Sequence, residues 1–231
     1  MKISIILPIY NEVEIIEKSL MKTEEFIKST NYDYEIILAE DGSKDGSDKI
    51  CEKLASRKKR IKHFHSDNRL GRGRALKKVL VKTTGDVLIY FDADLATDIS
   101  SVRELIKEIE MGYDVSIGSR LLPKSNVERL FAREIASRGY NLLARFLFHT
   151  EIKDLQCGLK AFRRSTLPIL LSANDNYWFW DSEILIMAEK ENLKISEIPV
   201  KWNEGNKSKV NILKDSIVMG LKLLRLKIKL I

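Results

Sequence analysis

Two aspartates one residue apart, Asp92 and Asp94, are of a type and spacing suited to metal chemistry. They follow an apolar run, Val87 to Phe91, whose β-branched and aromatic members predict a strand buried on both faces. Because alternate strand residues share a face, both carboxylates are expected to point into the crevice where such strands end. Carboxylate oxygens at this spacing suit Mg²⁺ or Mn²⁺ bridging to a diphosphate. A solvated turn after a strand is the plainer interpretation of so short a motif.

Strand and helix signals alternate through the first 120 residues and provide the elements that must position these acids. Asn11, three residues before Glu14, predicts a capping-box start for a helix over about 12–28. The pattern predicts strands at 3–9, 34–39, 61–64, 87–94 and 114–118, with helices near 46–58, after Gly71 and after Ser101. This order predicts an α/β fold with a mostly parallel, twisted sheet between two helix layers. Acidic loops follow the strands, at the ends where such sheets bind ligands.

The alternation of strand and helix signals ends after residue 120, and two amphipathic segments follow. One helix is expected over about 126–148, with an apolar flank beside a basic one that carries Arg129, Arg133, Arg138 and Arg145. The other is 212–231, in which five basic residues make a bilayer span costly. Both segments could lie flat on an anionic membrane surface. The first could instead be a core-packing helix with a solvated face, and the second a coiled-coil or oligomer contact.

Composition restricts the class of protein and its partners. The net charge of +7 favours an anionic partner, which could be nucleic acid, a membrane surface or a phosphorylated substrate. Two distant cysteines, Cys51 and Cys157, indicate reduced intracellular thiols and no zinc motif. No uncharged apolar run reaches the roughly 18 residues of a membrane span. The protein is therefore expected to be cytoplasmic or peripheral.

The glycines at 71 and 73 make no dinucleotide fingerprint, since position 76 is leucine, and the P-loop pattern is missing.

Several short motifs occur in an order that resembles the family 2 glycosyltransferases of GT-A (Rossmann-like) fold, in particular the polyprenyl-phosphate sugar synthases. The likeness covers nearly the whole chain. The matching segments are 7–12, 40–43, 68–75, 92–94, 118–120, 137–141, 154–160, 180–183, 199–202 and 208–209. The resemblance implies a three-layer catalytic domain that carries a nucleotide-sugar-binding half, 1–120, an acceptor-binding half, 121–211, and a C-terminal amphipathic helix, 212–231. It also implies an enzyme that moves a hexose from a nucleotide sugar to dolichyl or another polyprenyl phosphate.

The resemblance also implies roles for individual residues. Those that would hold the nucleotide are Pro8, Tyr10, Glu12 and Asp41. Asp92 and Asp94 would anchor the metal and the diphosphate, Arg120 and Arg133 would receive the lipid phosphate, and Lys207 and Lys209 would close over the pyrophosphate. A metal and lysines stabilise the charge that develops on a departing diphosphate. The acceptor phosphate is already ionised, so arginine forks matter more than a base. Asp181 is a candidate base, or orients the sugar or an acceptor-site arginine.

Departures from the family pattern bear on the donor. Glu40 stands where the family usually has aspartate, and Ala96 stands where the mannose synthases typically carry a glutamine that supplies a metal oxygen. The segments 92–97, 154–160 and 199–204 look like the glucosyltransferase branch, which favours a UDP-sugar such as UDP-glucose over GDP-mannose. GDP-mannose remains the alternative donor. Since no N-terminal membrane helix is seen, the two amphipathic segments would provide the whole attachment to the cytoplasmic face.

A basic nucleic-acid-binding module is a distant alternative. It would need aromatic residues interleaved with the basic ones, whereas the aromatics here adjoin acids and leucines. No nucleic-acid partner is therefore expected. The histidines at 63, 65 and 149 show no partner spacing and are assigned no role.

Overall fold

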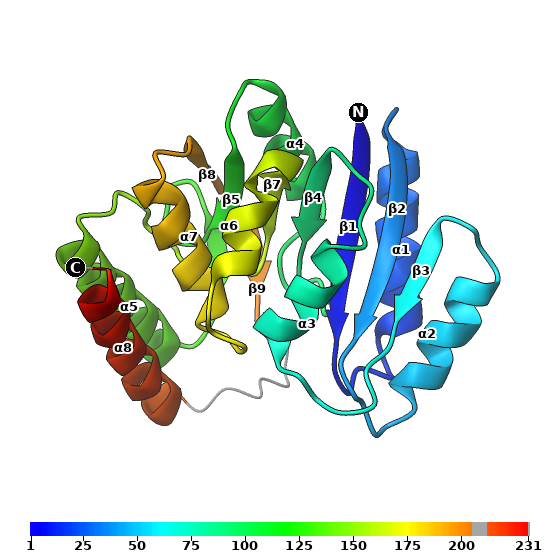
Figure 1. The fold of residues 1–231 in the computed structure, drawn as a ribbon, viewed down its shortest axis with the longest axis horizontal. Helices are drawn as coiled ribbons and strands as arrows, with labels where there is room; N and C mark the ends of the chain where they lie inside the picture. The colour runs from blue at the N-terminus through cyan, green and yellow to red at the C-terminus, as the bar shows by residue number, and fades with distance from the viewer. Residues whose placement is uncertain (205–211, 231) are drawn as a thin grey trace.

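The computed structural model describes residues 1–204 and 212–230. Its centre is a sheet of seven strands in the order β3-β2-β1-β4-β7-β5-β8 (Figure 1). The strands are β1 (Lys2–Ile9), β2 (Asp33–Glu40), β3 (Ile61–Phe64), β4 (Val87–Tyr90), β5 (Val115–Ser119), β7 (Lys160–Arg163) and β8 (Ile195–Pro199). Neighbours are parallel except at β7, which runs antiparallel to both β4 and β5. The expected mostly parallel sheet is confirmed, and the antiparallel β7 was not anticipated.

Helices cover both faces of the sheet (Figure 1). They are α1 (Ile16–Lys28), α2 (Ser47–Ser56), α3 (Arg72–Leu80), α4 (Ser101–Glu110), α5 (Phe131–Phe148), α6 (Leu167–Ser172), α7 (Trp180–Lys190) and α8 (Ile212–Lys229), with a 3₁₀ turn, Arg164–Thr166. Strand residues alternate between two cores. Ile5 and Leu38 pack with α1, α2 and α4, while Ile6 and Ile37 pack with α3, α6 and α7. The three-layer α/β architecture expected from the sequence is confirmed.

Two elements begin later than the sequence predicts. Helix α1 begins at Ile16, because Asn11 has a left-handed φ of 54° and its side-chain oxygen accepts the backbone N–H of Lys44 at 2.9 Å. The predicted capping box at Asn11 is therefore wrong. The single helix predicted over 126–148 is also wrong at its start. The chain first forms β6 (Asn126–Glu128), which pairs in parallel with β9 (Lys201–Asn203), and helix α5 follows at Phe131.

The two halves predicted to divide at residue 120 share the central sheet. Strand β7 of the second half inserts between β4 and β5 of the first, and β8 pairs with β5. Helix α8 lies alongside α5 at the β8 end of the molecule (Figure 1). Among the described residues, no helix is both long and apolar enough to cross a bilayer.

Candidate active site at the carboxyl edge of the sheet

Three neighbouring parallel strands, β2, β1 and β4, deliver polar residues to one edge of the sheet. Strand β1 leads into Tyr10 and Glu12, β2 leads into Asp41, and β4 leads into Asp92. The carboxyl ends of parallel strands meet at the same edge, which is where open α/β sheets bind ligands. The antiparallel strand β7 begins at this edge, since Lys160 pairs with Tyr90 at the end of β4. Residues from both halves of the chain therefore meet there.

Asp92 and Asp94 lie in a turn and not in a strand. Strand β4 ends at Tyr90, and the turn is closed by the N–H of Leu95, which donates to the carbonyl of Asp92 at 3.1 Å. Placing the two carboxylates by strand alternation was therefore wrong. The backbone of Gly158 lies so close to Asp92 that a Cβ at this position would come within 2.1 Å of the Asp92 Oδ2 atom. Any side chain at 158 would displace the Asp92 carboxylate.

The carboxylate of Asp94 is in surroundings that favour a cation. Loss of hydration raises its pKa, and the neighbouring carboxylates of Asp92 and Glu12 raise it further. The Asp94 Oδ1 atom accepts the N–H of Ala96 at 3.0 Å, and the residue is otherwise open to solvent. Carboxylates that repel one another at a solvent-accessible position fit a hard divalent cation such as Mg²⁺ or Mn²⁺.

A buried ionic network connects Asp92 to Asp181. The guanidinium of Arg72, at the start of α3, lies 2.7 Å from Asp92 Oδ1 through Nη1 and 3.2 Å from Asp181 Oδ2 through Nε. Asp181 also accepts from Lys160 Nζ at 2.9 Å and from the Tyr90 hydroxyl at 2.6 Å. No role was predicted from the sequence for Arg72, Lys160 or Tyr90. Arg72 and Lys160 do lie inside segments that carry the family resemblance, which was the available signal.

The network keeps Asp181 ionised. Burial alone would raise the pKa of Asp181, but the charges of Lys160 and Arg72 and the Tyr90 hydrogen bond outweigh it and lower the pKa. Arg72 has its pKa raised by Asp92 and Asp181 despite its own burial. Its Nη2 atom is buried and makes no hydrogen bond within the part of the chain that the structure describes.

Asp41 holds the loop that precedes α3. Its two carboxylate oxygens accept the backbone N–H groups of Leu70 at 2.7 Å and Gly71 at 3.0 Å. Burial raises the pKa of Asp41, although both hydrogen bonds lower it. On the same loop, the Arg69 guanidinium lies 4.0 Å from the centre of the Tyr10 ring. Pro8 is partly buried near the end of β1. The nucleotide-binding roles of these residues stay predictions.

Arg120 follows β5 and forms a two-pronged ion pair with Asp154. Its Nε lies 2.8 Å from Oδ2 and its Nη2 lies 2.9 Å from Oδ1 of that fully buried carboxylate. Arg120 lines a cleft of about 400 Å³, together with Ser125, Glu134 and Arg138. The segment that holds Asp154 also reaches the turn Asp92–Leu95, which we call the acidic turn, because Gly158 packs against Asp92.

Arg133 and the two C-terminal lysines complete the predicted set. The Arg133 guanidinium, in the first turn of α5, forms an ion pair with Glu204 just past β9. Lys207 and Lys209 lie outside the described residues, so their predicted closure over the pyrophosphate stays a prediction. Among the predicted residues, the structure links Asp92 to Asp181 through Arg72, whereas Arg133 pairs with Glu204.

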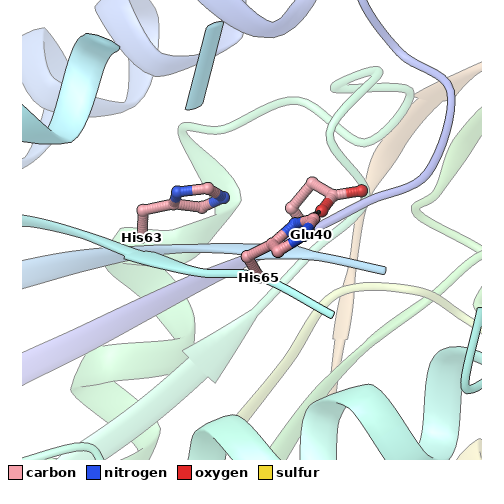
Figure 2. A group of neighbouring side chains, drawn as sticks. All are labelled: Glu40, His63 and His65. Carbon is pink, nitrogen blue, oxygen red and sulfur yellow. Dashed lines mark hydrogen bonds and ion pairs between the residues drawn. The ribbon is translucent and has the colours of Figure 1, made fainter. Parts of the chain in front are cut away.

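Two of the histidines without an assigned role meet a buried glutamate. His65 Nδ1 lies 2.5 Å from Glu40 Oε2, and the ring of His63 lies beside this pair (Figure 2). The hydrogen bond to Glu40 raises the pKa of His65, whereas burial lowers the pKa of His63. The expectation that the histidines are isolated is wrong for His65, which pairs with Glu40. Their contact with the end of β2 depends on strand pairing that residue spacing does not reveal.

The paired helices α5 and α8 carry more apolar residues than their packing uses. On α8, Met219, Leu223 and Leu226 are buried toward the rest of the protein. Large apolar residues of both helices remain exposed: Phe131, Ile135, Leu142, Phe146, Ile217, Leu221, Leu224 and Ile228. We call this set the α5–α8 apolar surface. An exposed apolar surface of this size on a monomer indicates an interaction site.

The same fold occurs in glucosyl-3-phosphoglycerate synthase from Mycobacterium tuberculosis, solved with Mn²⁺, UDP and glucosyl-3-phosphoglycerate. The TM-score is 0.68 over 97% of this chain and 78% of that one, at 19% sequence identity. The fold is thus that of the GT-A-like α/β enzymes. Residues 4–168 match Glycosyl transferase family 2, and the chain belongs to this family of glycosyltransferases. The resemblance stated from the motifs is confirmed.

Two curated relatives extend the likeness along the chain. Glycosyltransferase AglD of Haloferax volcanii is 40% identical over 228 residues, which cover 97% of this chain and 36% of AglD. Dolichyl-phosphate beta-glucosyltransferase ALG5D of Trichomonas vaginalis is 34% identical over 237 residues, which cover 97% of this chain and 72% of that protein. This chain therefore spans about a third of AglD and most of ALG5D.

Proposed function

We propose that this glycosyltransferase moves glucose from UDP-glucose to dolichyl phosphate or another polyprenyl phosphate, with inversion, at the cytoplasmic face of a membrane. The observation that carries this proposal is that one segment joins the two places: Gly158 packs against Asp92, and Asp154 pairs with Arg120, which lines the 400 Å³ cleft. A donor diphosphate and an acceptor phosphate must meet for transfer to occur. The name of the relative ALG5D supports glucose as the transferred sugar and the lipid acceptor.

The donor diphosphate would lie at the acidic turn. A divalent cation held there by Asp92 and Asp94 would stabilise the negative charge of the departing UDP. Arg72 supports this placement, because its buried Nη2 group can donate to an oxygen of the same diphosphate. Asp41 and Tyr10, which directly follow the neighbouring strands β2 and β1, are proposed to contact the nucleoside.

The acceptor phosphate would enter the cleft beside α5. Arg120 and Arg138 line this cleft and provide guanidinium donors for a phosphate. Arg133, in the first turn of α5, is proposed to contribute to the same site. The phosphate is ionised near neutral pH and can attack without a base. The lowered pKa of Asp181 and its bonds to Lys160 and Tyr90 support an orienting role.

The membrane would be reached through the α5–α8 apolar surface. Arg145, Arg225 and Lys229 are exposed on the same two helices. Apolar side chains with cations nearby suit the boundary of an anionic leaflet. This arrangement would present the phosphate of a lipid acceptor to a cleft that α5 itself borders.

A transfer assay with labelled UDP-glucose tests the proposal. Dolichyl phosphate, dolichol and 3-phosphoglycerate would be offered in parallel with Mn²⁺, and GDP-mannose would be compared as donor. We expect labelled lipid from dolichyl phosphate alone and only from the UDP-sugar. Transfer to 3-phosphoglycerate in place of the lipid would refute the acceptor assignment. A preference for GDP-mannose would refute the donor assignment.

A further inference from the structure

Glu40, His63 and His65 form a compact cluster at the outer edge of the sheet (Figure 2). One ligand atom from each residue lies within 4.8 Å of the others. Within residues 1–204 and 212–230, no other group of three or more histidine, cysteine, aspartate or glutamate residues meets this condition. The cluster stands on strands β2 and β3, whereas the acidic turn follows β4. Its residues are thus different from those proposed to bind the diphosphate.

Strand pairing holds these side chains together. Strands β2 and β3 are parallel, with Leu38 opposite His63 and Ala39 opposite Phe64. His63 and His65 are two residues apart, so an extended chain presents both on one face. Glu40 ends the neighbouring strand, and Figure 2 shows the His63 ring directed toward the Glu40–His65 pair. The backbone of the sheet thus fixes the spacing before any ligand binds.

One nitrogen of the cluster lacks a hydrogen-bond partner, and the other ligand atoms bond to one another or to the backbone. His63 Nε2 is buried and has no hydrogen-bond partner in the described part of the chain. The Glu40 carboxylate is fully buried, with one oxygen on the Ser43 N–H and the other on His65. His65 is 43% exposed, so an ion can reach the cluster from solvent. A buried nitrogen without a partner, facing a buried carboxylate, is costly unless something occupies the space between them.

The ligand types distinguish this cluster from the acidic turn. Two imidazoles and one carboxylate suit Zn²⁺ and its neighbours Co²⁺ and Ni²⁺, whereas carboxylates alone suit Mg²⁺ and Mn²⁺. The negative charges of Asp48 and Glu52 also act on His63, and Asp67 Oδ1 lies 3.5 Å from His65 Nε2. These acids add to the negative potential of Glu40 and favour a cation.

We propose that Glu40, His63 and His65 bind a divalent transition metal of the Zn²⁺ class, at a second site independent of Asp92 and Asp94. The ion takes one ligand atom from each residue and replaces the direct hydrogen bond between Glu40 and His65. It ties the edge strand β3 to the end of β2, next to Asp41 and the loop that Asp41 holds. Solvent access at His65 leaves room for water as a further ligand.

Titration of the full chain with Zn²⁺ after treatment with a chelator tests the proposal. Isothermal titration calorimetry should show one Zn²⁺ per chain, and Co²⁺ should give the visible absorption of a site with histidine ligands. His63→Gln and His65→Gln should each weaken Zn²⁺ binding by at least about 100-fold, since loss of even an outer partner of a metal ligand costs 10–100-fold. His149→Gln, at an exposed histidine after α5, should bind as the wild type does.

The acidic turn provides the second control. Asp94→Asn should keep the Zn²⁺ affinity and the Co²⁺ spectrum, and excess Mg²⁺ should displace neither ion. Circular dichroism would show that each variant is folded. Zn²⁺ binding that survives in His63→Gln and His65→Gln, or that disappears in Asp94→Asn, overturns the proposal. Absence of stoichiometric Zn²⁺ binding by the wild-type chain also overturns it.

Discussion

Lys160 and Asp181 form a buried ion pair, with 2.9 Å between Nζ and Oδ1. The lysine comes from the antiparallel strand β7 and the aspartate from the first turn of α7, so the pair joins two elements of the second half of the chain. Arg72 extends the pair to Asp92. Lys160 and Arg72 lie on either side of Asp181 and keep its carboxylate charged. Arg72 also holds Asp92 in position.

Asp181→Asn should therefore reduce activity without removing an acidic limb from the pH–rate profile. The low pKa of Asp181 and its three partners make it a poor proton acceptor. Because the substitution leaves Lys160 buried with less compensation, we expect a loss of about 3–5 kcal/mol in the free energy of unfolding. Tyr90→Phe removes only one hydrogen bond and serves as the milder variant. Loss of the acidic limb in a folded Asp181→Asn variant would identify a general base instead.

Arg72→Lys should lower kcat/KM by about 10–100-fold, because a lysine cannot hold Asp92 and Asp181 together while offering a further N–H to the diphosphate. Mn²⁺ affinity measured without nucleotide should not weaken, since Arg72 opposes a cation at Asp92. Arg74→Lys is the matched control, as Arg74 is exposed on the same helix. Equal effects of both substitutions would contradict the assigned position of Arg72.

Glu35 provides a prediction about stability and pH. This buried carboxylate accepts hydrogen bonds from Ser4 and Thr84 and pairs with Lys62, and these contacts lower its pKa to about 2 despite its burial. Its contribution is fully present above the unfolded pKa of 4.5 and is lost as the pH falls toward 2. Glu35→Gln should cost about 3 kcal/mol at pH 7. In urea unfolding the difference from wild type should shrink at pH 3, and a constant difference would contradict this assignment.

Vesicle binding tests the α5–α8 apolar surface. Phe146 and Ile228 are 76% and 75% exposed on α5 and α8. Replacing Phe146 by serine should weaken sedimentation with anionic vesicles about tenfold, since insertion of such a side chain contributes about 1.5–3 kcal/mol. Ile228→Ser should act in the same direction. Met21→Ser, at an equally exposed apolar position on α1, should have no effect. Unchanged vesicle binding, with a loss of self-association, would indicate an oligomer contact.

Local patterns were sufficient to predict the five strands of the first 120 residues but not the antiparallel β7. The acidic residues that follow β1, β2 and β4 meet at one edge because the carboxyl ends of parallel strands do. The pattern failed where tertiary contacts decide the structure. Asn11 binds the backbone of Lys44 and so does not cap a helix.

Side-chain partners were the other part that the sequence did not predict. Arg72, Lys160 and Asp181 are far apart in the chain and meet only because β7 inserts beside β4. Glu40 and His65 meet through the pairing of β2 with β3. Spacing along the chain carries no information about such contacts. The family resemblance pointed to segments that contain several of these residues, but not to which atoms they bind.

The most direct test of the proposed function compares lipid-linked glucose formed by the wild-type chain and by Asp94→Asn. Both would receive UDP-glucose, dolichyl phosphate and Mn²⁺, and Asp98→Asn, at an exposed aspartate four residues later, would serve as control. Asp94→Asn should form product at least about 100-fold more slowly, since a metal stabilises such a transition state by several kcal/mol. Asp98→Asn should match the wild type. Undiminished product formation by Asp94→Asn would contradict the assignment of the acidic turn to the metal and the diphosphate.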